Sequence, residues 1–335
     1  MAKKMKPEQY LCVSAYVRGL ESQLLTGADL SRMIDADSLQ EAIRLLTEHG
    51  YPEMTPTMAS LDETLRTARE ATLESLSAFL PSGSNSGIIL DLFRIHYDYH
   101  NVKVALKALW TGADAAHLLM QGGRLDPQEL WSQLLAGEDA FLPQPLQDAV
   151  RAARETVGAT GDPQKGDLLL DKACFAEQNA MAEASGNAFL KDYTRLLTDI
   201  ANLRTLVRVL RMGKNILLLQ EALVDGGSIS ADVLLEAARG GTVTEPYQAT
   251  ALEEAAALGA HALADGGLTA FEKACDDTLT HFLQGTILIS FGPEPVLAYI
   301  AAREQEQRNI RIIISGRLAG LSPATIRERM RESYV

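Results

Sequence analysis

One short pattern occurs three times in the chain and constrains the fold more than any other feature. Its copies are Asp98-x-x-Asn101-Val-Lys103, Asp199-x-x-Asn202-Leu-Arg204 and Glu306-x-x-Asn309-Ile-Arg311. Each copy reads acid, two residues, asparagine, apolar residue, base, and successive copies start 101 and 107 residues apart. With only seven asparagines in the chain, three chance matches are not expected. The repetition therefore indicates internal duplication.

Other stretches keep step with this pattern. LDKAC at 170–174 and FEKAC at 271–275 lie 101 residues apart, and LDETL at 61–65 is a weaker earlier copy. Downstream of each copy a glycine-bearing turn leads to a residue typical of a helix N-cap: Asp126, Ser230 and Ser322. We predict three homologous helical units over residues 1–112, 113–220 and 221–335. The period is too long for a solenoid, so we expect three subdomains and not a rod.

The fold class follows from the apolar spacing. Apolar residues recur every three to four positions through most of the chain, as at Leu61, Leu65 and Ala68. Aromatic residues make up only 6% of the chain, which disfavours a sheet. Glycine- and proline-rich loops separate the periodic runs, and no run alternates like a strand. The sequence predicts an all-α protein.

On a helical wheel the acid and the asparagine of each copy fall on or beside the apolar face. The bases Lys103, Arg204 and Arg311 point to the opposite side. An acid and an asparagine on a packing face need partners, because burying them unpaired is costly. We therefore interpret the pattern as a packing or capping device inherited by duplication, in preference to a direct binding site.

Two catalytic alternatives fit the sequence less well. His96 and His100 lie one helical turn apart and could bind a metal, but Asp98 faces away from them and no third ligand is evident. The Gly-Lys pair in RVLRMGKN lacks the spacing and the final Ser or Thr of a phosphate loop. Cys174 and Cys275 occupy equivalent positions and are expected in the core. The sequence predicts no catalytic residue, no metal and no cofactor.

The totals limit the partners and the location. A net charge of −13 disfavours nucleic acid, although residues 303–335 are mildly basic. Three cysteines without a CxxC pair suit a reducing cytoplasm. The longest apolar runs are far too short to span a membrane. A soluble helical scaffold is compatible with these features.

Longer stretches resemble a known family. The C-terminal stretch FGPEPVLAYIAAREQEQRNIRIIISGRLAGLSPATIRERMRESYV is similar to the C-terminus of the C subunit of prokaryotic V-type (A-type) rotary ATPases, the counterpart of the eukaryotic d subunit. The N-terminal stretch from Tyr10 to Tyr51, YDYHNVKVALKAL and TDIANLRTLVRVLRMGKN resemble other parts of that family. The resemblance covers nearly the whole chain, and only the histidines flanking Asp98 depart from it.

The resemblance implies a fold and a role. The family's three similar helical subdomains surround a pseudo-threefold axis and form a funnel. One side receives the central-stalk subunits D and F, and the other sits on the membrane proteolipid ring at the cytoplasmic face. Such a subunit is peripheral, transmits torque for ATP-coupled H⁺ or Na⁺ transport, and binds no nucleotide. Candidate partner contacts are the basic residues Lys107, Arg208, Arg211 and Arg308, together with Arg204 and Arg311.

Overall fold

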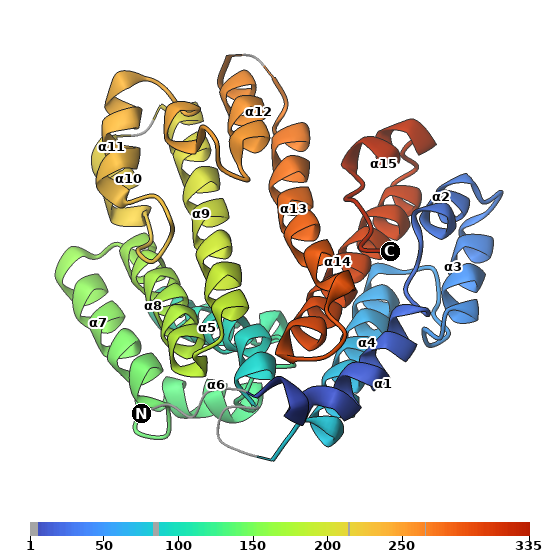
Figure 1. Cartoon of the computed structure of the whole chain (residues 1–335). Helices are drawn as coiled ribbons and strands as arrows, with labels where there is room; N and C mark the ends of the chain where they lie inside the picture. Colours follow the sequence, from blue (N-terminus) through green and yellow to red (C-terminus); the bar gives the residue numbers. More distant parts are fainter. Residues whose placement is uncertain (1–5, 83–86, 214, 265) are drawn as a thin grey trace. The chain divides into compact units, whose positions relative to one another are not determined.

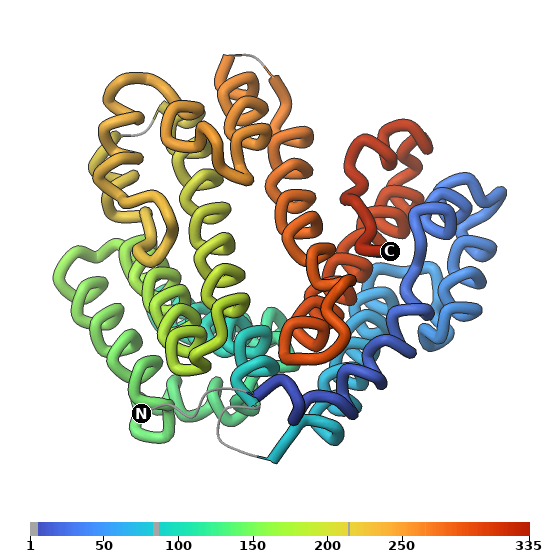
Figure 2. Tube along the Cα trace, in the orientation of Figure 1, coloured from blue at the N-terminus to red at the C-terminus, as the bar shows by residue number. Residues whose placement is uncertain are grey.

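The chain folds into helices joined by loops. The computed structural model describes residues 6–82, 87–213, 215–264 and 266–335, and over these residues it contains no strand. The predicted all-α class is therefore confirmed. The trace in Figure 2 shows successive helical coils from the blue N-terminal part to the red C-terminal part. Among the described residues no helix is both long enough and apolar enough to cross a bilayer.

Internal contacts divide the chain into two compact units. The mid-chain unit comprises residues 88–241. Its helices are α5 (Ile88–Thr111), the 3₁₀ turn η2 (Ala116–Leu118), α6 (Pro127–Leu135), α7 (Gln144–Thr160), α8 (Pro163–Ser185), α9 (Ala188–Arg211), α10 (Ile216–Ala222) and α11 (Ala231–Gly240).

The terminal unit combines the described residues before 88 with residues from 242 onward. Its first part holds η1 (Pro7–Tyr10), α1 (Leu11–Glu21), α2 (Gly27–Asp35), α3 (Leu39–Glu48) and α4 (Met58–Phe79). Its second part holds η3 (Glu245–Tyr247), α12 (Glu253–Ala264), α13 (Leu268–Gln284), η4 (Gly285–Leu288), α14 (Pro293–Leu318) and α15 (Pro323–Arg329). The predicted boundaries after 112 and 220 are not tested by this division and stay a prediction.

The core of the mid-chain unit forms around α5. Val102, Ala105 and Leu106 face inward, as the helical wheel predicts, and pack against α6, α7 and α8 (Figure 1). Partners in this core include Leu130, Leu146 and Leu170. The helical wheel also places Leu109 on this face, but its side chain is exposed.

The core of the terminal unit repeats this arrangement around α14. Ile310, Ile313 and Ile314 are fully buried against α2, α3, α4 and α15. The segment from α2 to α4 is separated from α14 by more than 200 residues of sequence, yet it covers α14 as α6 to α8 cover α5. The two long helices that carry the first and third copies of the pattern thus have matching surroundings.

Candidate functional site

The first copy of the pattern holds a loop against α5. Asp98 is fully buried, and its carboxylate accepts hydrogen bonds from the backbone N–H groups of Arg124 (2.9 Å) and Leu125 (3.2 Å). The Arg124 guanidinium also donates to Asp98 at 2.6 Å and to Glu177 of α8 at 2.7 Å. Burial raises the pKa of the Asp98 carboxyl, and Arg124 offsets part of that rise.

Asn101 fixes the same loop one turn further along α5. Its side-chain amide donates to the carbonyl of Met120 at 2.8 Å and accepts the N–H of Met120 at 2.8 Å. An asparagine can do both because its side chain carries a donor and an acceptor side by side, like a peptide group. The residue therefore pairs with the backbone much as a neighbouring strand would.

The second copy makes the same contacts on α9. Asp199 accepts the N–H and the hydroxyl of Ser228 at 2.8 and 2.6 Å, and a longer contact of 3.4 Å comes from the N–H of Ile229. Asn202 exchanges two hydrogen bonds of 2.8 Å with the backbone of Val224. In both copies the loop thus closes on the acid directly before the next helix, α6 or α11.

A glycine makes this approach sterically feasible. A Cβ on Gly123 would lie 2.3 Å from a carboxylate oxygen of Asp98, and one on Gly227 would lie 2.2 Å from that of Asp199. Neither distance leaves room for a carbon atom. These glycines occur in the stretches GGRL and GGSI, whose composition by itself indicates only a turn.

The third copy differs in how its acid is satisfied. Asn309 pairs with the backbone of Arg331 through two bonds of 3.0 Å, as in the other copies. Glu306 instead accepts the N–H of Leu25, from the N-terminal part of the chain, and the hydroxyl of Tyr51 at 2.6 Å. It also pairs with Arg303, one helical turn before it.

Leu25 occupies the position held by Leu125 and Ile229 in the other copies. Leu125 directly precedes the N-cap residue Asp126 of α6, and Ile229 precedes the N-cap residue Ser230 of α11. Leu25 likewise precedes Thr26, which caps α2. The N-terminal segment therefore completes the arrangement around α14 that downstream residues complete around α5 and α9.

This equivalence corrects the predicted alignment of Ser322 with Asp126 and Ser230. Ser322 lies 13 residues after Asn309, as Asp114 and Asn215 lie 13 residues after Asn101 and Asn202. Each of these three residues accepts a backbone N–H at the start of the short helix that follows: η2, α10 or α15. The alignment with Asp126 and Ser230 is wrong. The helix that Ser322 caps, α15, comes before Arg331, the residue that pairs with Asn309, whereas α6 and α11 come after the residues that pair with the other two asparagines.

The pattern bases Lys103 and Arg311 form ion pairs across aligned helices. Lys103 pairs with Asp171 in the LDKAC stretch of α8, and Arg311 pairs with Asp62 in the LDETL stretch of α4 at 2.6 Å. Arg204 is partly buried on α9. Lys103 and Arg311 thus each bind a neighbouring helix of their own compact unit, although the two partners of each pair lie in different predicted repeats.

The other residues predicted to contact partners remain at the surface. Lys107 is exposed and pairs with Asp167 at 2.5 Å, and Arg308 pairs with Asp276 at 2.9 Å. Arg208 and Arg211 are exposed near the end of α9. The exposed bases of these pairs remain accessible to a partner, and the predicted contacts stay a prediction.

The histidines beside the first copy do not meet a cluster of acids. The ring of His96 lies against Tyr97, with 3.8 Å between the ring centres, and His100 Nε2 lies 3.1 Å from the carbonyl oxygen of Leu118. Within the described ranges, no three His, Cys, Asp or Glu side chains gather as a metal site requires.

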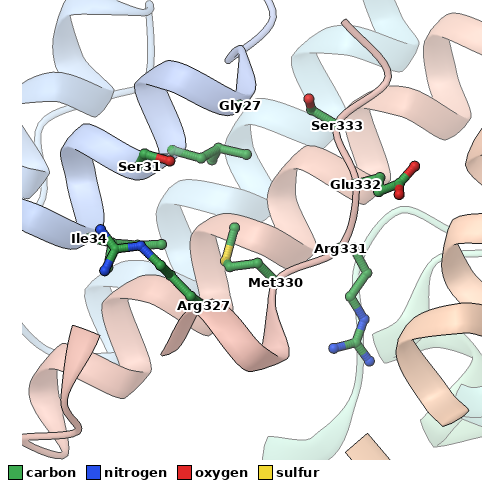
Figure 3. Close-up of a pocket in the computed structure, with 9 residues that line it drawn as sticks. Gly27, Ser31, Ile34, Arg327, Met330, Arg331, Glu332 and Ser333 are labelled. Atoms are coloured by element: carbon green, nitrogen blue, oxygen red, sulfur yellow. The ribbon is translucent and has the colours of Figure 1, made fainter. Parts of the chain in front are cut away.

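A groove lies between the two sequence segments that make up the terminal unit. It has a volume of about 400 Å³ and runs between α2 and the C-terminal segment (Figure 3). Leu30, Ile34 and Met330 supply its apolar part, and Arg327, which pairs with Asp35, borders it. Arg331 also lines the groove, but its guanidinium points away from it and pairs with the buried Asp276 at 2.8 Å.

Comparison with known proteins gives a consistent assignment. The family described as "ATP synthase (C/AC39) subunit" matches residues 13–329. The C subunit of the V-type sodium ATPase of Enterococcus hirae is 26% identical over 97% of this chain and 99% of its own length. The C subunit of the V-type ATP synthase of Thermus thermophilus is 24% identical over 96% and 98%, and that of the A-type ATP synthase of Methanocaldococcus jannaschii is 25% identical over 95% and 85%. The chain therefore belongs to the ATP synthase (C/AC39) subunit family, as a non-catalytic subunit of the V/A-type ATPases.

Proposed function

We propose that this chain couples the central shaft of a V/A-type rotary ATPase to its membrane ring. In this role it receives subunits D and F on one side, rests on the proteolipid ring on the cytoplasmic side, and turns with both. The observation that carries the proposal is the family match over residues 13–329, together with relatives aligned over nearly their full length.

The contacts of the repeats suit a part that transmits torque. A coupling element must resist shear between its helices, and buried charged hydrogen bonds fix helices more stiffly than apolar contacts alone. Asp98, Asp199 and Glu306 each tie a long helix to a separate backbone segment. The proposed funnel around a pseudo-threefold axis would place three such ties at equivalent positions.

Co-purification tests the proposal. A tagged chain should retain central-stalk subunits and a proteolipid ring when membranes are solubilised under conditions that preserve the ATPase. If the chain is recovered with neither while the remaining subunits stay associated, the proposal fails. A soluble scaffold unrelated to the ATPase would stay in the supernatant on membrane fractionation.

The basic residues of the long helices are tested in the same assay. Replacing Arg204, Arg208 and Arg311 together by Ala should reduce the recovery of partner subunits. Arg32, Arg44 and Arg239, which form exposed pairs within a single helix, provide a matched triple replacement. Equal recovery for the two triple variants would remove the contact role while leaving the coupling role standing.

A further inference from the structure

A small cavity lies beside the acid of the third copy. Its volume is about 10 Å³, and its polar lining includes Glu306 and Asn309 of α14 together with Ser333 and Tyr334 of the C-terminal segment. Ser333, which Figure 3 labels on the wall of the larger groove, lines the cavity as well. A space of this size has room for one water molecule.

A hydrogen-bond donor on the wall of this cavity has no protein acceptor. Gln305 is only 8% exposed, and its side-chain Nε2 meets no acceptor among the described residues. The Oε1 atom of the same amide accepts the Arg308 guanidinium at 2.9 Å, and this bond fixes which end of the amide carries the unused N–H groups. A buried amide donor without an acceptor is costly, so a bound water is the usual solution.

The acid on the same wall can accept a further hydrogen bond. In the first two copies the aspartate accepts N–H groups from two successive loop residues. In the third copy Tyr51 and Arg303 share one oxygen of Glu306. Within the described ranges the other oxygen accepts the N–H of Leu25 alone. A carboxylate oxygen has two lone pairs, so this oxygen keeps one acceptor site.

The chain itself does not supply the second donor in the third copy. The N–H of Leu24, the residue before Leu25, donates to the carbonyl of Glu21 at 3.2 Å and closes the end of α1. Tyr334 lies three positions after the residue paired with asparagine, where the other copies have Gly123 and Gly227. The cavity therefore lies where the other copies bring loop backbone against the acid.

We propose that a buried water molecule occupies this cavity, accepts a hydrogen bond from Gln305 Nε2 and donates one to Glu306. Water can play both parts because it carries donors and acceptors, and these two partners are what a buried water requires at least. The water takes the place of the second loop N–H that the acids of the first two copies accept.

The lining favours water over an ion. The charge of Glu306 is already paired with Arg303, so no net charge faces the cavity from this pair. Leu24, Leu30 and Ala302 complete the wall with apolar atoms, which would leave an ion without further ligands.

A high-resolution crystal structure of this chain tests the inference directly. We expect one ordered water within hydrogen-bond distance of both Gln305 Nε2 and the Glu306 carboxylate. A cavity without ordered density, or a Gln305 amide bonded to a protein acceptor, would overturn the inference.

Oxygen-17 relaxation dispersion gives a second readout in solution, because it counts water molecules that stay bound for longer than the protein takes to tumble. Gln305→Met keeps the length of the side chain and removes the donor, so one such water should be lost. The matched control is Gln147→Met in α7. Gln147 is 9% exposed, but its amide donates directly to the carbonyl of Asp139 at 3.0 Å, so no water should be lost.

Two results of the solution measurement would contradict the proposal. These are an unchanged count of long-lived waters in Gln305→Met, and an equal loss in the two Met variants. If Gln305→Met does not fold, the crystal structure of the wild-type chain still decides. Both measurements use the isolated chain, so their outcome does not depend on the coupling role, which co-purification judges separately.

Discussion

The segments that follow α10 and α15 occupy matching places but are built differently. After α10, six residues of continuous chain lead from Val224 to the cap of α11, and Gly227 lies against Asp199. After α15, Asn309 pairs with Arg331, and the N–H that the acid accepts comes from Leu25, 281 positions away from Glu306 in sequence. One arrangement is a single continuous loop, and the other is assembled from two segments that lie far apart in sequence.

The difference accounts for the residue types in the third copy. Tyr334 stands where Gly123 and Gly227 stand in the other copies, and its hydroxyl lies 3.0 Å from that of Thr286. With a tyrosine there the backbone cannot approach α14 as closely, and Glu306, one carbon longer than aspartate, reaches Leu25 and Tyr51 instead. The buried acid thus accepts hydrogen bonds in all three copies, but in the third copy these donors come from a segment far away in sequence.

Removing the buried acid that holds a continuous loop should have the largest effect on stability. Asp98→Ala leaves two loop N–H groups without their acceptor and leaves Arg124 paired with Glu177 alone, which we expect to destabilise the protein by about 3 kcal/mol. Chemical denaturation measures the change. The control is Asp114→Ala, an exposed cap that should cost about 1 kcal/mol. Equal losses for both variants would show that Asp98 does not hold the loop.

Adding one methyl group to either of the continuous loops should have the next largest effect on stability. Gly123→Ala and Gly227→Ala each force a carbon against a carboxylate, with an expected cost of about 2–3 kcal/mol. Gly158→Ala in α7 is the matched change, because a Cβ there meets nothing and alanine favours a helix. Thermal unfolding of the three variants would contradict the steric argument if Gly158→Ala were the most damaging.

A third test concerns a carboxyl that only the third copy has. Glu304 stands where the other copies have His96 and Leu197, and burial raises its pKa to about 7. A raised carboxyl pKa means that folding favours the protonated form, so the stability contributed at low pH falls as pH rises towards 7.

Glu304→Gln should therefore stabilise the protein at high pH. We expect its advantage over wild type to grow by about 2 kcal/mol between pH 5.5 and pH 8. Unfolding free energies measured across this range provide the test. An advantage that is constant with pH would mean that Glu304 is not the titrating group.

The smallest expected effect comes from a change at Tyr334. Tyr334→Phe removes the hydroxyl contact with Thr286 and should cost about 1 kcal/mol. Hydrogen exchange should become faster in α2, which borders the C-terminal segment, and should stay unchanged in α6 and α11. Faster exchange in all three helices would mean that the change destabilises the whole protein and does not act on the arrangement around α14 alone.

The sequence was informative where a residue's role depends on its own helix. The buried face of α5, with Asp98 and Asn101 on it, follows from spacing alone. The partners of those side chains did not follow, because Arg124, Met120 and Leu25 reach the helix only through tertiary folding. The spacing of Gly123 and Gly227 before a helix cap was visible, but their steric reason required the position of the carboxylate.

The paired hydrogen bonds of the three asparagines also fix both ends of the short segment before each loop. Each asparagine joins backbone residues 19 or 22 positions apart, and the bracketed stretch holds a 3₁₀ turn in one repeat and a seven-residue helix in the other two. Because closing a longer loop costs only about 0.6 kcal/mol for each doubling of its length, these stretches should accept inserted sequence without loosening the long helices. Each asparagine thus fixes both ends of the stretch, and the exposed sequence between these ends can vary.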